Sequence, residues 1–133
     1  MAHGVGECGG GIIRGERAAA TPIRTFSSGA TRDTASGKPD YAGYLSPLVL
    51  QRFGRYMLQH QTQSDGTLRA SDNWKRGIPK NAYMSSLWRH FLDVWLLHEE
   101  YPAATANLED ALCALLFNVQ GYLHETLREE KNG

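Results

Sequence analysis

This sequence has no excess of positive or of negative charge. Its 133 residues contain 14 Lys and Arg against 14 Asp and Glu, so the formal net charge at pH 7 is zero. Such a balance argues against a nucleic-acid-binding tail and against a strongly acidic partner. No stretch approaches the ~20 consecutive apolar residues that span a bilayer, and the N-terminus lacks the charged and apolar segments of a signal peptide. We therefore expect neither a nucleic acid nor a membrane as partner.

Cysteine is scarce as well, with two residues in the whole chain. Cys8 lies in a glycine-rich segment, whereas Cys113 lies in the apolar run from Ala111 to Phe117. A disulfide framework is not expected from this pair, and Cys113 is predicted to be a small core residue.

A chain of this length can form one domain with a modest core, and helical proteins of this size often complete their core with another copy.

The first part of the chain has no apolar periodicity. Residues 1–39 are rich in Gly, Ala, Ser, Thr and Arg, which is typical of a segment without regular structure. We expect a flexible leader over residues 1–25 and a single domain over residues 26–133. The polar stretch from Phe26 to Tyr41 contains Arg and Lys with small residues and could bind an anion, although a surface arm without function is an alternative.

Three helices are predicted from capping residues and apolar spacing. Ser46 and Pro47 read as N-cap and first residue of a helix that runs to about Gln61. Asn81 is the expected cap of a second helix, which Pro102 brings to an end. Asn107 is the expected cap of a third helix, which ends near Arg128.

The first two of these helices are joined by a segment with turn chemistry around one large aromatic residue. Ser64 to Thr67 break the helical pattern, and Trp74 follows within a run of polar residues. Trp74 is expected to cover the core, while its neighbours Asn73, Lys75 and Arg76 form a polar cluster that could hold a phosphate or a base.

The second helix is apolar on nearly every side, which predicts a place in the middle of a bundle. Its polar residues Arg89, His90 and Asp93 then need partners. The short connection to the third helix predicts an antiparallel hairpin, which would bring Glu109 and Asp110 towards them. Carboxylates with one imidazole suit Mg²⁺ or Mn²⁺, which prefer oxygen ligands.

A purely structural role is the alternative for the same residues. Arg89 and Asp93 are spaced for an ion pair within one helix, and Glu109 and Asp110 stand where acidic side chains stabilise a helix N-terminus. Asn118 interrupts the apolar body of the third helix, where a buried amide needs partners that a substrate could supply.

Several stretches of the chain resemble a phage family of dATP/dGTP diphosphohydrolases. The resemblance covers about residues 29–127. It is carried by Trp88–His98, Glu109–Asn118, Thr31–Asp33 with Gly37–Asp40, and Asp72–Gly77.

The resemblance implies an all-α helical bundle of MazG-like type, here with a long irregular N-terminal arm. In MazG-like pyrophosphohydrolases a Glu-x-x-Glu on one helix and a Glu-x-x-Asp on the next hold Mg²⁺. This chain has His90-x-x-Asp93 in the first place and Asp110-x-x-Cys113 in the second, so it departs from that pattern at two acidic positions. The resemblance thus implies Asp93, Asp110 and Glu109 as catalytic residues and, with His90, as ligands of Mg²⁺ or Mn²⁺.

The implied activity is hydrolysis of a purine (deoxy)nucleoside triphosphate, with dGTP as the expected substrate, to the monophosphate and pyrophosphate. A homo-oligomer, dimer or tetramer, and a cytoplasmic location (that of the host cell for a phage protein) are expected with it. The residues expected to contact the substrate are Lys38, Asn73, Trp74, Lys75, Arg76, Arg89 and Asn118. A helical module that only dimerises or binds a partner, without catalysis, is the competing hypothesis.

Overall fold

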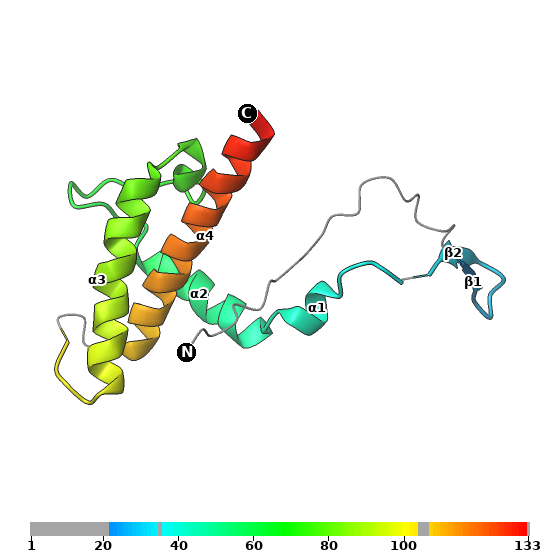
Figure 1. The fold of residues 1–133 in the computed structure, drawn as a ribbon, viewed down its shortest axis with the longest axis horizontal. Coiled ribbons are helices and arrows are strands. Elements are labelled where there is room, and N and C mark those ends of the chain that lie inside the picture. The colour runs from blue at the N-terminus through cyan, green and yellow to red at the C-terminus, as the bar shows by residue number, and fades with distance from the viewer. Residues whose placement is uncertain (1–21, 35, 104–106, 133) are drawn as a thin grey trace, which may run out of the picture. The chain divides into compact units, whose positions relative to one another are not determined.

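The computed structural model describes residues 22–34, 36–103 and 107–132, and the chain divides after Asp40 into two compact units. The first unit contains two short strands, β1 (Ile23–Thr25) and β2 (Thr31–Asp33). The second is helical, as expected for a mainly α protein (Figure 1). Most of the predicted leader, residues 1–21, lies outside the described residues. The helical elements are α1 (Tyr41–Tyr44), α2 (Pro47–Gln59), the 3₁₀ helix η1 (Asn73–Arg76), α3 (Lys80–His98) and α4 (Leu108–Asn132).

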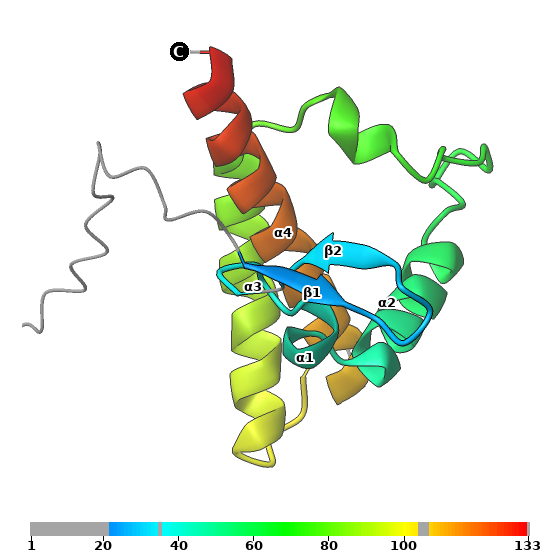
Figure 2. The same cartoon turned by 90° about the vertical axis from the view of Figure 1, so that its right-hand side faces the viewer.

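The sequence predicts an irregular N-terminal arm, and this prediction is wrong for residues 23–33. These residues form an antiparallel hairpin (Figure 2). Its turn is closed by two backbone hydrogen bonds, from Phe26 N–H to Ala30 O at 2.8 Å and from Gly29 N–H to Phe26 O at 2.9 Å. Gly29 has a φ of 85°, a conformation that other residues adopt only at a cost. Three-residue strands show too little alternation for a sequence pattern to reveal them.

The start of α2 confirms the sequence prediction. The Ser46 hydroxyl accepts a hydrogen bond from Val49 N–H at 3.3 Å, and Pro47 is the first helical residue. This arrangement satisfies one of the free N–H groups of the first turn, and the fixed φ of proline suits the position.

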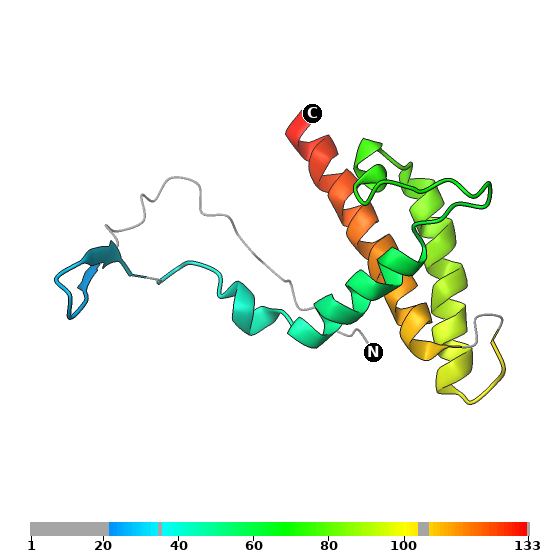
Figure 3. The same ribbon diagram turned by 180° about the vertical axis from the view of Figure 1, so that it is seen from behind.

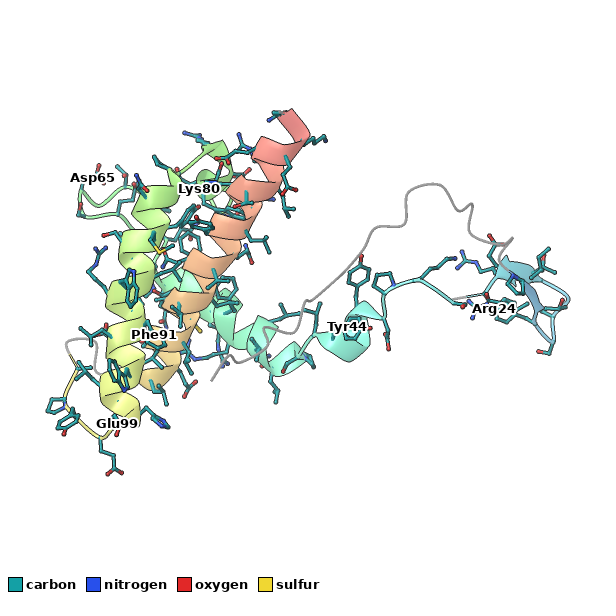
Figure 4. The ribbon with its side chains drawn as sticks, viewed as in Figure 1. Arg24, Tyr44, Asp65, Lys80, Phe91 and Glu99 are labelled. Carbon is teal, nitrogen blue, oxygen red and sulfur yellow. The ribbon has the colours of Figure 1, made fainter. Side chains whose placement is uncertain are left out.

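The predicted cap of the next helix is wrong. Pro79 stands at the N-cap of α3 without a side-chain hydrogen bond, and Asn81 already lies inside the helix. Pro79 has a φ of −57° and a ψ of 141°, so the chain turns into the helix directly after it. Figure 4 labels Lys80 at the start of α3 and Glu99 just past its end.

The predicted cap of α4 is confirmed, because the Asn107 side-chain oxygen accepts hydrogen bonds from the N–H groups of Glu109 at 2.8 Å and Asp110 at 3.3 Å. Helices α3 and α4 lie side by side as the expected antiparallel hairpin, and α2 crosses α4 obliquely (Figures 1 and 3). α4 extends to Asn132, four residues beyond the predicted end near Arg128.

The core of the second unit is small and centres on the contact between α3 and α4. Tyr83 is 1% exposed, and its ring lies against Gly121 so closely that there is no room for a β-carbon on that glycine. Small residues of α4 complete this contact, since Ala111, Cys113 and Ala114 are buried too. The prediction that Cys113 is a buried core residue is confirmed.

The expected place of α3 in the middle of a bundle is wrong for the single chain. Trp88 and Trp95 are 68% and 56% exposed, and Phe91 and Leu92 are exposed beside them. α3 packs against α4, while the stripe that carries these four residues has no cover among the residues that the structure describes. None of the helices over the described ranges is at once long and apolar enough to cross a membrane.

Candidate functional site

The segment between α2 and α3 folds back on itself and forms one wall of a cavity. Thr62 and Leu68 pair as an antiparallel bridge, and Arg69 N–H donates to Gln61 O at 2.7 Å. Asp65 closes the turn, because its carboxylate accepts hydrogen bonds from both the N–H (3.0 Å) and the hydroxyl (2.6 Å) of Thr67. These bonds lower the pKa of the Asp65 carboxyl below its ordinary value, first through the hydroxyl and then through the N–H.

The cavity has a volume of about 710 Å³, within the range of ~300–1,000 Å³ usual for small-molecule sites. Two predicted substrate residues, Asn73 and Trp74, belong to its lining. The remaining walls come from the second half of α2, from the segment 61–78 and from the middle of α4. Their main members are Phe53, Tyr56, Met57, His60, Ile78, Phe117 and Gln120.

Trp74 is held in place by aromatic contacts with α4. Its ring meets Phe117 edge-on with centroids 6.5 Å apart, and it meets His124 in the same manner at 4.7 Å. Lys75 Nζ lies 5.7 Å from the Trp74 ring centroid, and the carbonyl of Lys75 accepts a hydrogen bond from Arg128 at 2.9 Å. Trp74 therefore covers part of the core, as predicted, and lines the cavity as well.

Polar groups accompany the aromatic walls. The residues that line the cavity include Gln61, Gln63, Asn73 and Gln120, which carry side-chain amides, and Arg69, which carries a guanidinium. Amides can donate to and accept from the edge of a heterocycle, and a guanidinium can bind an anion. Aromatic walls with a few polar groups of this kind suit a planar, partly anionic ligand.

Glu109 and Asp110 form an acidic pair in the first turn of α4, where α4 contacts α2. Arg52 of α2 donates from Nε to Glu109 Oε1 at 2.8 Å and from Nη2 to Asp110 Oδ1 at 2.6 Å. The Asp110 side chain is 30% exposed, that of Glu109 68% and that of Arg52 21%. The hydrogen bonds to Asp110 and then to Glu109 raise the pKa of Arg52 above its ordinary value, so the guanidinium stays charged.

Tyr56 connects the acidic pair to the cavity. It lines the cavity, and it follows Arg52 by one helical turn on the same face of α2. Burial, and after it the negative charge of Asp110, raises the pKa of the Tyr56 phenol. The Tyr56 ring also stacks on His60 at 4.1 Å, and the two rings together form the α2 side of the wall.

Cys113 lies one turn after Asp110, at a position where the MazG-like pattern has an acid. The thiol is buried, and desolvation raises its pKa, although Arg52 acts in the opposite direction. A neutral thiol is a poor ligand for a hard cation. Cys113 therefore belongs to the packing between the helices.

The structure does not bring the four expected metal ligands together. Glu109 and Asp110 share Arg52, whereas His90 and Asp93 lie half-buried on α3. Nδ1 of His90 is buried without a hydrogen-bond partner among the described residues. Across residues 22–34, 36–103 and 107–132, no three His, Cys, Asp or Glu side chains are grouped so as to hold a metal ion. The four expected ligands are therefore not grouped as the sequence predicts within the part of the chain that the structure describes.

The remaining substrate candidates are distributed over both units. Arg89 donates to the hydroxyls of Ser85 at 2.9 Å and Ser86 at 3.0 Å on its own helix. Asn118 is buried and donates to Ala114 O at 2.7 Å, so one of its donors is satisfied within α4. Arg76 is exposed at the end of η1, and Lys38 belongs to the first unit.

Sequence reasoning missed Arg52, Tyr56 and Arg69. Arg52 is a basic residue within an amphipathic helix, a position usually exposed to solvent, and its two partners are 57 and 58 residues away. Tyr56 was visible only as part of the apolar face of that helix. A scan of protein-family models and searches of curated proteins and of solved structures found no match to this chain.

Proposed function

We propose that this chain is a metal-dependent pyrophosphohydrolase of purine nucleoside triphosphates, with dGTP as the expected substrate. One observation carries the proposal: a cavity of nucleotide-compatible volume is walled by Trp74 and Tyr56, and Arg52, one helical turn before Tyr56 on α2, holds the acidic pair Glu109 and Asp110. The resemblance to phage dATP/dGTP diphosphohydrolases, and within them to the cyanophage enzyme MazZ, supports it. The monophosphate product would then serve synthesis of the diaminopurine nucleotide for phage DNA.

The residues of the cavity can bind and orient such a substrate. Trp74 and Tyr56 would contact the faces of the base, and the amides of Asn73 and Gln120 would contact its edge. Arg69, and Arg52 once it is released from the carboxylates, would bind phosphate oxygens through their planar guanidinium groups. In the reaction, water adds to the α-phosphorus, the bond to the bridging oxygen breaks, and pyrophosphate leaves.

Mg²⁺ or Mn²⁺ belongs to the proposal as a requirement to be tested. Asp93, Asp110 and Glu109, together with His90, are its candidate ligands, although one chain does not group them. A bound metal would supply charge neutralisation of the triphosphate. Asp110 has the further role of holding Arg52 when no substrate is bound.

A panel of all ribo- and deoxyribonucleoside triphosphates, with Mg²⁺, Mn²⁺ or chelator and with products separated by chromatography, tests this function. We expect purine monophosphate and pyrophosphate in the presence of metal only. Asp93→Asn and Asp110→Asn should each lower turnover by about 10²-fold or more. Glu130→Gln, an exposed acid on α4, is the matched control and should retain full turnover. Diphosphate as product, or full activity of both Asn variants, would contradict the proposal.

A helical oligomerisation module is the second candidate, favoured by the apolar faces of α3 and α4 that the described residues leave exposed. Besides the aromatic stripe of α3, α4 exposes large apolar residues at helical spacing, namely Leu112, Leu116, Val119, Leu123 and Leu127. Apolar surface on this scale marks an interaction site, and a second copy of the chain would cover it in a dimer or tetramer.

Trp88→Glu should dissociate such an oligomer in sedimentation analysis, whereas Leu68→Glu, an equally exposed apolar residue outside both helices, should leave it intact. A monomeric wild type would contradict oligomerisation. An oligomer without turnover of any nucleotide would favour the module over the enzyme.

A further inference from the structure

The hairpin of the first unit places two arginines directly opposite each other. The register pairs Arg24 of β1 with Arg32 of β2, flanked by the pairs of Ile23 with Asp33 and of Thr25 with Thr31. Directly opposed residues of an antiparallel pair project to the same face, with Cβ atoms about 4.5–5.5 Å apart. Like charges at this position destabilise strand pairing, so the arrangement carries a cost that a bound anion would remove.

Lys38 adds a third positive charge to the same place. Arg24, Arg32, Asp33 and Lys38 together line a hollow of about 440 Å³, which contains three cationic side chains and one carboxylate. Within the ranges that the structure describes, no ion pair engages Arg32, Asp33 or Lys38. The hollow is therefore positively charged and retains its capacity to bind an anion.

Arg24 also contacts an aromatic ring. Its guanidinium carbon lies 5.1 Å from the centroid of the Phe26 ring, two residues further along the chain. Figure 4 labels Arg24 on the hairpin. Stacking on an aromatic ring leaves the guanidinium N–H groups at its edge available as donors. Two guanidinium groups and one ammonium in a hollow of this size match an anion with several phosphate groups better than a single phosphate.

We infer that the hollow lined by Arg24, Arg32 and Lys38 is a binding site for an oligophosphate group, either of a nucleoside triphosphate or of free polyphosphate. The site is formed by residues of the first unit alone and does not depend on the proposed hydrolysis. Lys38 is predicted from the sequence to contact phosphate. In this proposal it does so in the hollow of the first unit and not in the helical unit.

Calorimetric titration of the full chain with inorganic tripolyphosphate tests the inference, because this ligand has no base. Arg24→Gln and Arg32→Gln should each weaken binding by about tenfold, as expected for loss of a charge-assisted contact. Asp33→Asn should tighten binding several-fold, because Asp33 is the one acidic side chain among the described residues that line the hollow. Arg55→Gln, an exposed arginine of α2, is the matched control and should not change the affinity by more than about twofold.

Arg32→Gln is expected to weaken binding, whereas Asp33→Asn is expected to tighten it. Because disruption of the hairpin would weaken binding in both variants, these opposite effects keep the test independent of hairpin folding. Titration with dGTP distinguishes the two sources of the phosphate group, and equal sensitivity of dGTP and tripolyphosphate to Arg32→Gln supports a site that recognises phosphates alone. Affinity for tripolyphosphate that is unchanged in both Gln variants would overturn the inference. So would a DNA oligonucleotide that binds the hairpin and is not displaced by tripolyphosphate.

Discussion

Replacement of Gly121 by alanine is expected to destabilise the helical unit, although alanine is the better helix former. A β-carbon at this position would overlap Cε1 and Cζ of Tyr83 and lie 2.6 Å from its hydroxyl oxygen. Tyr83 is 1% exposed, so its ring cannot move aside into solvent. Relief of the overlap requires α3 and α4 to separate at the centre of their contact.

The magnitude follows from two opposing effects. Overpacking of a core costs about 1–3 kcal/mol, and the gain in helix propensity from Gly to Ala returns about 1 kcal/mol. Because the overlap with Tyr83 involves buried ring atoms, we place the net loss at about 1–2 kcal/mol. In a domain of this size, each kcal/mol lowers the melting temperature by about 4–8 °C.

Thermal melting at fixed protein concentration, followed by circular dichroism, measures the effect. Gly54→Ala is the matched control: Gly54 lies within α2, and a β-carbon there would meet nothing within 4 Å. This substitution should therefore stabilise the protein by about 0.5–1 kcal/mol. If Gly121→Ala raised the melting temperature as Gly54→Ala does, the close contact between Tyr83 and α4 would be refuted.

Three further experiments examine the helix start, the buried thiol and the ion pair of the site. Asn107→Ala removes the cap that serves both Glu109 and Asp110 and should cost about 1 kcal/mol, whereas Asn107→Asp should retain most of the stability in the same melting assay. Burial raises the pKa of Cys113 above its ordinary value, so its contribution to stability is intact below the unfolded pKa of about 8.5 and is lost as the pH rises beyond it. The free energy of unfolding should accordingly fall above about pH 8.5, and the fall should be smaller in Cys113→Ala; an unchanged slope would argue against a desolvated thiol. Arg52→Gln should weaken nucleotide binding if Arg52 passes from the carboxylates to the substrate, and a Kd for dGTP equal to that of wild type would assign Arg52 to helix packing alone.

The sequence alone determined where the long helices lie. Ser46 with Pro47, and Asn107 with the acidic residues after it, are local signals that act through hydrogen bonds within one turn. The second helix, predicted to end before Pro102, ends at His98. These features are legible because caps, proline geometry and the 3.6-residue period depend on neighbours in the chain. The capping role of Asn81 was predicted in the same way and was wrong, because Pro79 begins the helix itself.

Only the tertiary structure decided which polar residues meet. Arg52 joins Glu109 and Asp110 across more than fifty residues, and Trp74 and Tyr56 line one cavity from different segments. The grouping of Asp93 with Asp110 was inferred from helix pairing, yet pairing alone does not set the rotation of each helix about its axis, and no three-ligand group results within the described ranges. Contacts between distant segments depend on packing, on crossing geometry and on which side chains fit, and no local periodicity encodes them.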